Sequence, residues 1–328
     1  MSHVAYELST QPACWERAAE LAPARRDGLP RPGERTAFVG CGTSYYMAQA
    51  AAALREEAGH GETDAFAASE FPAGRRYDRV VALTRSGTTT EVLDLLAALR
   101  DSGAATGTRT RTGSGISTGT GTGTDAGTDT RTRTTVVVGD PDTPAVSLAD
   151  DVVVLDFADE HSVVQTRFAT TALTLLRAHV GRHTPDVVAD GHTALAEPLP
   201  AGLESCGQFT FLGRGWSVGL AHEAALKMRE ASLSWSESYP AMEYRHGPIS
   251  VSGPGTATWA FGEAPEGLAE QVRQTGAQWV AGRLDPLAEL VRVHRLAVAV
   301  AAQQQLDPDR PRHLTRSVIL TAGEEAVR

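Results

Sequence analysis

Short apolar runs alternate with helix-like patterns along most of the chain. The runs expected to form strands lie at residues 36–40, 80–84, 135–139, 152–157, 209–213 and 257–261. Their apolar residues are consecutive rather than alternating, which is typical of parallel strands covered by helices on both faces. The pattern therefore predicts an α/β fold of the doubly wound, parallel-sheet type.

The chain also contains an internal repeat. The segment FVGCGTSYYMAQAAAALREE from Phe38 matches FLGRGWSVGLAHEAALKMRE from Phe211, and both place glycines, a serine and a glutamate at equal offsets. The matched pairs are Phe38 with Phe211, Gly40 with Gly213, Gly42 with Gly215, Ser44 with Ser217, and Glu57 with Glu230. Two copies of one strand–turn–helix unit predict two related domains, 1–200 and 201–328.

Residues 103–134 have a different composition, almost entirely Gly, Thr, Arg and Asp. A segment without an apolar face cannot offset the entropy lost on ordering, so a disordered surface insertion is expected there. Long surface loops cost little stability, and the simplest interpretation is a tolerated expansion without a function of its own.

Composition narrows the class of protein. The formal net charge of −10 argues against a nucleic-acid-binding surface. The sequence has neither an apolar run long enough to span a bilayer nor an N-terminal secretory pattern. The three cysteines, Cys14, Cys41 and Cys206, form no CxxC pair, which argues against a disulfide framework or a cysteine-based zinc site. A soluble cytoplasmic protein is expected.

The first chemical signal is the segment VALTRSGTTTEVLDLLAALR from Val81 to Arg100, in which hydroxyl residues surround Gly87 between a strand and a helix. Backbone N–H groups at a helix start, together with Thr84, Ser86, Thr88 and Thr89, would suit a phosphate monoester without a fixed positive charge. The segment lacks the GxxxxGK[ST] pattern of a P-loop. The simpler alternative is that Ser86 or Thr88 only caps the helix.

A second glycine turn has the same character. Gly42, Thr43 and Ser44 follow the first strand, and Cys41 is expected to be a small turn residue rather than a nucleophile. Neither this turn nor residues 213–215 complete the GxGxxG fingerprint, which argues against an NAD-dependent dehydrogenase.

The second half of the sequence provides ionisable groups. Glu223, Lys227 and Glu230 are spaced i, i+4 and i+7 on one face of an apolar helix, so Glu230 is a candidate general base that Lys227 tunes. The alternative is a salt bridge on a solvated face. His246 precedes Gly247-Pro248, a rigid turn suited to acid–base work near neutral pH. Gln165 could also be presented to a ligand.

Several motifs resemble those of the sugar isomerase (SIS) family. They are CGTS at 41–44, SGTT at 86–89, GRG at 213–215, HEAALKMRE at 222–230, EYRHGP at 243–248 and DPDRPRHLTRSV at 307–318. They are most similar to the tandem-SIS isomerase part of glucosamine-6-phosphate synthase and to its glutaminase-free relatives, the amino-sugar-phosphate deaminase/isomerases and fructosamine-6-phosphate deglycases. The resemblance covers nearly the whole chain except the insertion.

The resemblance implies a role for most of these residues. Cys41 to Ser44 and Thr84 to Thr89 would hold the sugar phosphate, and Glu230 would move a proton between C1 and C2. His246 would open the sugar ring from the neighbouring subunit of a homodimer. Glu223 and Lys227 match sugar-contacting positions.

Two departures from the synthase pattern matter. The sequence shows no amidotransferase domain and no cysteine at residue 2, so glutamine hydrolysis is not expected. Arg316 stands where the synthase has lysine, and a guanidinium, which stays protonated, cannot form a Schiff base. Arg85, where the synthase has glutamine, could add charge to the phosphate cradle or point to solvent.

Taken together, the sequence predicts a homodimeric enzyme acting on a phosphorylated hexose or amino-hexose with nitrogen at C1 or C2. Isomerisation would be coupled to deamination or deglycation, without a metal or cofactor. The alternative is a non-catalytic sugar-phosphate sensor, and a dehydrogenase is the weakest possibility.

Overall fold

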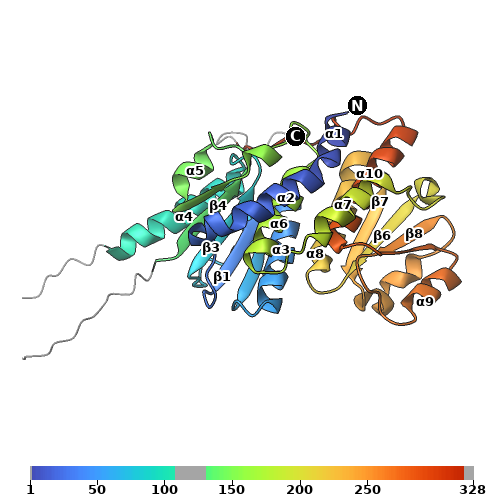
Figure 1. Cartoon of the computed structure of the whole chain (residues 1–328), viewed down its shortest axis with the longest axis horizontal. Coiled ribbons are helices and arrows are strands. Elements are labelled where there is room, and N and C mark those ends of the chain that lie inside the picture. Colours follow the sequence, from blue (N-terminus) through green and yellow to red (C-terminus); the bar gives the residue numbers. More distant parts are fainter. Residues whose placement is uncertain (1, 108–130, 321–328) are drawn as a thin grey trace, which may run out of the picture.

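The computed structural model describes residues 2–107 and 131–320, which form two parallel β-sheets flanked by helices (Figure 1). The first sheet has the order β2-β1-β3-β4-β5 and the second β7-β6-β8-β9, with every neighbouring pair parallel. The strands are β1 (Thr36–Gly40), β2 (Thr63–Ala67), β3 (Arg79–Thr84), β4 (Arg133–Val138), β5 (Asp151–Val154), β6 (Gln208–Gly213), β7 (Trp235–Pro240), β8 (Thr256–Ala260) and β9 (Gln278–Ala281). The predicted α/β class is confirmed.

Helices cover both sheets and fill the space between them. They are α1 (His3–Ser9), α2 (Gln11–Leu21), α3 (Thr43–Glu57), α4 (Thr90–Gly107), α5 (Pro144–Leu148), α6 (Arg167–His179), α7 (Asp186–Ala196), α8 (Ser217–Ser232), α9 (Leu268–Gln274) and α10 (Pro286–Gln303). Helices α3 and α8 pack on each other between the sheets, and one apolar core joins residues of both halves. The division at residue 200 stays a prediction. Among the helices of the described ranges, none has the length and apolar character needed to cross a bilayer.

The sequence repeat corresponds to a repeated piece of structure. Units β1–α3 and β6–α8 each occupy the second position of their sheet, and each strand is joined to its helix by a glycine turn. A Cβ on Gly40 would lie 2.6 Å from the Ser44 carbonyl carbon, and one on Gly213 would lie 2.3 Å from the Ser217 oxygen. Only glycine therefore allows the strand and the helix to approach this closely.

Two details of the predicted elements need correction. The strand expected at 152–157 ends at Val154, and residues 156–158 form a short 3-10 helix. The expected disorder over 103–134 is wrong at both borders, because α4 continues through Gly107 and β4 begins at Arg133. Asp150 and Asp151 hold the start of β4, accepting from the Thr134 N–H at 2.8 Å and from the Arg133 guanidinium. Residues 108–130 lie outside the described residues.

Candidate functional site

A cavity of about 250 Å³ lies at the carboxyl end of the first sheet, where the turns after β1 and β3 separate. In the order 2-1-3-4-5 the chain leaves β1 and β3 in opposite directions, which opens a crevice where ligands commonly bind. The lining residues are Cys41, Gly42, Thr43, Ser44, Leu83, Thr84, Arg85, Ser86, Thr89, Val92, Val163, Gln165, Glu230, Leu314, Thr315, Arg316, Ser317 and Val318.

The turn after β1 forms one wall of this cavity. Gly42 has a φ of 54°, a left-handed conformation that leads directly into α3. Burial is the main reason that the pKa of the Cys41 thiol rises to about 11. The thiol is therefore protonated at neutral pH, and the expectation of a turn residue rather than a nucleophile fits this chemistry.

The loop after β3, residues 84–89, forms the opposite wall and is called the hydroxyl loop below. Its hydroxyl groups also stabilise the conformation of the loop. Gly87 N–H donates to Thr84 Oγ1 over 3.2 Å, and Thr88 N–H donates to Ser86 Oγ over 3.3 Å. Gly87 has a φ of 61°, and a Cβ there would lie 2.0 Å from Thr143 Oγ1. Gly87 and Thr88 support the loop from outside the cavity lining, whereas Thr84, Ser86 and Thr89 line it.

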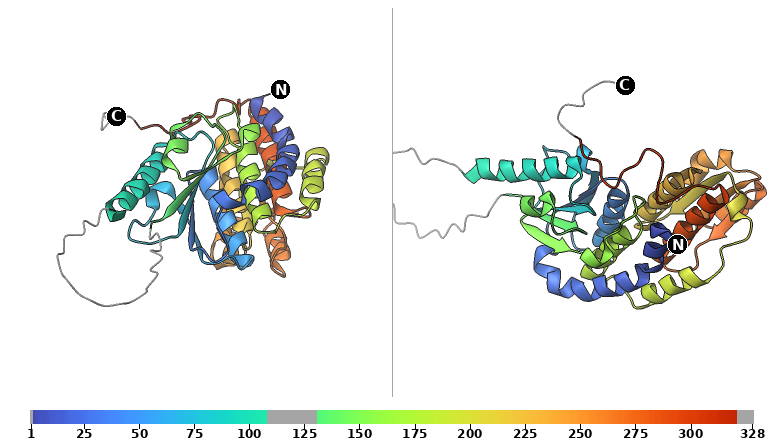
Figure 2. Two further views of the ribbon diagram at one scale, coloured as in Figure 1. Left: turned by 60° about the vertical axis from the view of Figure 1, so that its left-hand side comes forward. Right: turned by 90° about the horizontal axis from the view of Figure 1, so that it is seen from above.

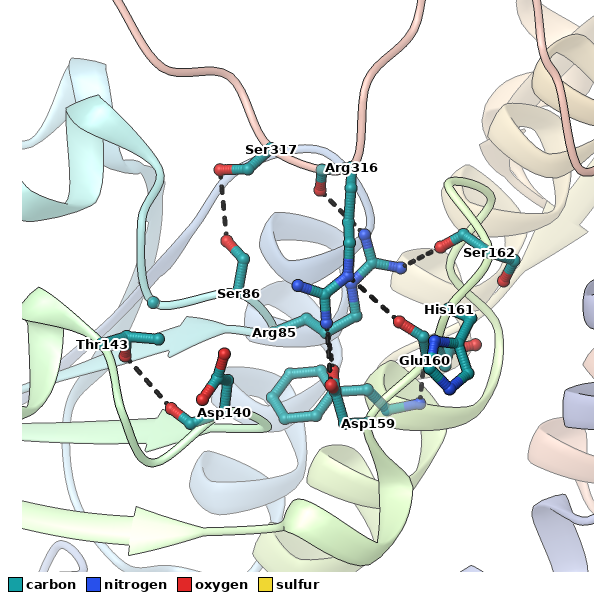
Figure 3. A network of polar contacts seen from close by, with 12 residues as sticks. Arg85, Ser86, Asp140, Thr143, Asp159, Glu160, His161, Ser162, Arg316 and Ser317 are labelled. Atoms are coloured by element: carbon teal, nitrogen blue, oxygen red, sulfur yellow. Dashed lines mark hydrogen bonds and ion pairs between the residues drawn. The ribbon is translucent and has the colours of Figure 1, made fainter.

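The segment after α10 closes the cavity from a third side. It returns across both halves to the first sheet (Figure 2), where Ser317 meets the hydroxyl loop. Ser317 Oγ lies 3.2 Å from Ser86 Oγ and 2.9 Å from Thr88 Oγ1 (Figure 3 shows the first contact). The backbone continues the contact, since Thr90 N–H donates to the Val318 oxygen over 3.1 Å.

Two arginines bring positive charge to the cavity, contrary to the expected uncharged cradle. Arg85 is 5% exposed, so it does not point to solvent, and it donates to the carbonyl oxygens of Ser162 and Arg316 over 2.8 Å each. Arg316 forms an ion pair with Asp159, in which Nη2 lies 2.6 and 2.8 Å from the two carboxylate oxygens (Figure 3). Burial lowers the pKa of Arg85, but a guanidinium stays protonated in proteins. Arg85 makes no ion pair with the described residues.

The segment before α6 places Gln165 in the cavity lining. The residues around Gln165 instead stabilise the start of α6. The buried Glu160 carboxylate accepts from the backbone N–H groups of Thr166 and Arg167 over 2.7 Å each, which caps the start of α6. Thr166 therefore faces Glu160 rather than the cavity.

Helix α8 brings an acid–base cluster from the second half to the same cavity. Glu230 lines it, with a side chain 19% exposed. The Lys227 ammonium contacts the Glu230 carboxylate and lies 3.4 Å from Glu223 Oε1. Lys227 and Glu223 are each 1% exposed, so the alternative of a salt bridge on a solvated face is wrong.

Burial and mutual attraction set the charges in this cluster. Burial raises the pKa of Glu223 to about 8, although Lys227 partly offsets the effect. Burial alone would lower the pKa of Lys227, but the two carboxylates outweigh it and raise that pKa. Lys227 is therefore a cation shared by two carboxyl groups.

A close helix contact explains how Glu230 reaches the turn after β1. A Cβ on Gly219 of α8 would lie 2.5 Å from the Tyr46 carbonyl oxygen of α3. The repeat makes the arrangement reciprocal, because a Cβ on Gly215 would lie 2.5 Å from Glu57 Oε1. The C-terminal part of α3 thus lies against the glycine turn after β6, and the C-terminal part of α8 lies against the glycine turn after β1. Only the turn after β1, beside Glu230, has the hydroxyl loop next to it.

Three predicted site residues of the second half do not line the cavity. Glu223 and Lys227, predicted to contact the sugar, are buried behind Glu230. His246 lies away from the cavity altogether. It is exposed at the end of the 3-10 helix Glu243–His246, before Gly247 with a φ of 137°, and it does not line the cavity within the described ranges. Sequence reasoning missed Asp159, Val163 and Ser317. The motif at 307–318 was the signal that could have pointed to Ser317.

The sequence matches no protein-family model. It is 25% identical over 334 residues to a glutamine–fructose-6-phosphate aminotransferase (isomerizing) of Methanothermobacter thermautotrophicus. That alignment covers 87% of this chain and 51% of the relative, so the chain spans about half the length of the relative.

Solved structures share the fold over nearly the whole chain. Glucosamine-6-phosphate deaminase from Thermotoga maritima has a TM-score of 0.76 at 21% identity, covering 97% of this chain and 100% of that one. The C-terminal domain of glucosamine-fructose-6-phosphate aminotransferase from Francisella tularensis has a TM-score of 0.73 at 18% identity, covering 94% and 97%. Fold, repeat and motifs place the chain among proteins with the sugar isomerase (SIS) fold.

Proposed function

We propose that the protein isomerises a hexose 6-phosphate that carries nitrogen at C1 or C2 and then releases that nitrogen. The observation that carries the proposal is one shared cavity: Glu230 from the second half and the hydroxyl loop from the first half line the same space. A phosphate held by the loop would place the carbon chain of the sugar beside the carboxylate.

The phosphate would be held by neutral donors and one cation. Backbone N–H groups at the starts of α3 and α4 lie at the positive ends of helix dipoles, and Ser44, Ser86 and Thr89 add hydroxyl groups. Arg85 supplies a guanidinium without a carboxylate partner of its own in the described chain. A dianionic monoester would thus be preferred to an unphosphorylated sugar.

Glu230 would carry the proton. On an open-chain 2-amino aldose phosphate, it removes the C2 proton to give an enaminol and returns it at C1, leaving an imine at C2. Water then adds to the imine carbon, and the C–N bond breaks to give the ketose phosphate and ammonia. Lys227 would hold the carboxylate in place and stabilise its charge.

Arg316 would act by charge and position, since a guanidinium forms no Schiff base. Its pairing with Asp159 fixes the segment that closes the cavity. Ring opening is assigned to His246, which would enter the site from a second subunit of a homodimer.

The test is a substrate panel. The protein is mixed with glucosamine 6-phosphate, galactosamine 6-phosphate and fructosamine 6-phosphates, and ketose phosphate, ammonia and amine are measured. Release of ketose phosphate with ammonia or amine is expected for at least one of them. A folded protein that turns over none of them is not this enzyme, and binding without turnover would favour a sugar-phosphate sensor.

Glu230→Gln separates catalysis from binding. We expect turnover to fall roughly 10²- to 10⁴-fold, because the general base is lost, while ligand affinity changes little. Glu57→Gln is the matched control, since Glu57 holds the equivalent place in the repeat and should leave turnover unchanged. Equal losses in both variants would contradict the assignment.

A further inference from the structure

A row of buried polar side chains, joined by hydrogen bonds, lies behind the cavity, between α2, α6, α8 and α10. Trp15 Nε1 donates to the Thr170 hydroxyl over 3.0 Å, and that hydroxyl donates to Gln11 Oε1 over 2.8 Å. Gln11 Nε2 lies 3.3 Å from His294 Nδ1, and His294 Nε2 lies 4.0 Å from Glu223 Oε1. All five side chains are fully buried, and the proton-transfer steps above use none of them.

The direction of donation along this row is set at Trp15, because an indole N–H can only donate. Thr170 accepts from Trp15, and the acceptor nearest to its hydroxyl is the amide oxygen of Gln11 at 2.8 Å, compared with 3.1 and 3.2 Å for the carbonyl oxygens of Thr166 and Arg167. The amide nitrogen of Gln11 then donates to His294 Nδ1. Burial lowers the pKa of His294 well below its usual value, so the imidazole is neutral and carries its hydrogen on Nε2. That N–H is the group on the side of Glu223.

Glu223 is surrounded by few groups that can set its charge. Lys227 and Glu230 face it from its own helix, Thr43 and Tyr46 from α3, and His294 from α10. Within the described residues, neither carboxyl oxygen of Glu223 nor Nε2 of His294 has a hydrogen bond of ordinary geometry. Glu223 has the Lys227 ammonium 3.4 Å away but accepts no hydrogen bond of ordinary geometry, so an N–H hydrogen without another acceptor is complementary to it.

We propose that His294 is a positioning residue whose Nε2–H, oriented by Gln11, favours the ionised form of Glu223. An ionised Glu223 draws the charge of Lys227 towards itself and adds a negative neighbour to Glu230. Both effects make Glu230 a stronger base. This consequence rests on the proposed function, and His294 itself touches no substrate.

The experiment follows the Glu223 carboxyl directly. Protein labelled with ¹³C at the glutamate side-chain carboxyl is titrated by NMR, and the signal lost in Glu223→Gln identifies the residue. His294→Leu should move the midpoint of this titration upward by about one pH unit, because a donor to the ionised form is lost. His294→Gln should restore most of the shift, since its amide can accept from Gln11 and donate to Glu223.

An unchanged midpoint in a folded His294→Leu protein overturns the proposal. If that variant does not fold, Gln11→Met decides in its place. It removes the group that orients His294 and should move the midpoint in the same direction, and no movement overturns the proposal.

Kinetics provide the second measurement. In His294→Leu, kcat should fall roughly threefold at pH 8 and little at pH 6, where Glu223 is neutral in both proteins. An equal loss at both pH values contradicts transmission through Glu223. A wild-type protein without turnover refutes the proposed function alone, because the NMR titration still tests His294.

Discussion

At the scale of single residues, Arg85 is the most informative side chain to change. Arg85→Gln should weaken binding of a hexose 6-phosphate roughly tenfold to a hundredfold, because a charge-assisted contact is lost. Binding of the unphosphorylated sugar should hardly change. Titration calorimetry with both ligands measures this difference, and Arg76→Gln at an exposed position is the control. Equal weakening for both ligands would show that Arg85 does not recognise the phosphate.

Glu223 makes protein stability depend on pH. Its pKa is about 8 in the folded protein and 4.5 ordinarily, so between these values the folded state holds a proton that the unfolded state has lost. Stability therefore falls as the pH rises through this window. Below pH 6.5 the buried His294 and the half-buried His222 and His179, whose pKa values burial lowers, make stability change in the opposite direction.

The stabilities of the wild-type protein and of Glu223→Gln are therefore compared above pH 6.5. Between pH 6.5 and 8 the wild-type protein should lose about 1–2 kcal/mol of unfolding free energy relative to Glu223→Gln. Urea denaturation at both pH values measures the difference. Parallel changes in the two proteins would mean that Glu223 is already ionised at pH 6.5.

Residue chemistry in short motifs could be predicted, whereas partners distant in the sequence could not. The hydroxyl loop and Glu230 were found because their residue types and spacing carry their chemistry. The contact of Arg316 with Asp159 joins positions 157 residues apart, and no local pattern indicates it. The sequence also did not decide whether Arg85 points into the cavity or to solvent, because the groups that it contacts, at Ser162 and Arg316, are far away in the sequence.

At the scale of elements, the contact between α3 and α8 positions the base. An alanine in a helix normally stabilises relative to glycine, by roughly 0.5–1 kcal/mol. Gly219→Ala should instead destabilise by about 1–3 kcal/mol and lower turnover, because its Cβ would press on the Tyr46 carbonyl and move α8 away from α3. Thermal unfolding and turnover are measured together. Gly74→Ala, at a position with open space, is the control, and a stabilised Gly219→Ala would contradict this packing.

The sequence predicted the strands inside the sheets and missed three of the four edge strands. The predicted strands β1, β3, β4, β6 and β8 are buried over nearly their whole length, and each contains a run of apolar residues or of apolar residues and threonine. Strands β2, β7 and β9 lie at sheet edges, are partly exposed and carry polar residues such as Glu237. An edge strand is partly exposed to solvent and can therefore carry polar residues, so its sequence shows a less continuous apolar run than that of a central strand. Strand β5 is also an edge, and only its end was misplaced.

At the scale of the whole molecule, the two halves depend on each other. Each contributes its long helix to the contact between the sheets, and one apolar core includes residues of both. The cavity likewise combines a turn and a loop from the first half with Glu230 from the second. Among the described residues given a role in the proposed reaction, Lys227 is buried behind Glu230, whereas His246 is exposed and does not line the cavity.

If His246 acts, it must come from another copy of the chain, and mixing inactive variants tests this. Glu230→Gln and His246→Ala are each expected to be inactive alone. After subunit exchange in an equal mixture, half of the dimers are mixed and one site in each mixed dimer is intact, so activity should recover to about a quarter of the wild-type level. Glu230→Gln mixed with Arg85→Gln should gain nothing beyond the weak activity of the Arg85→Gln chains, because each chain brings both positions to its own cavity. Light scattering confirms the dimer, and a mixture that stays inactive while exchanging subunits would remove His246 from the mechanism.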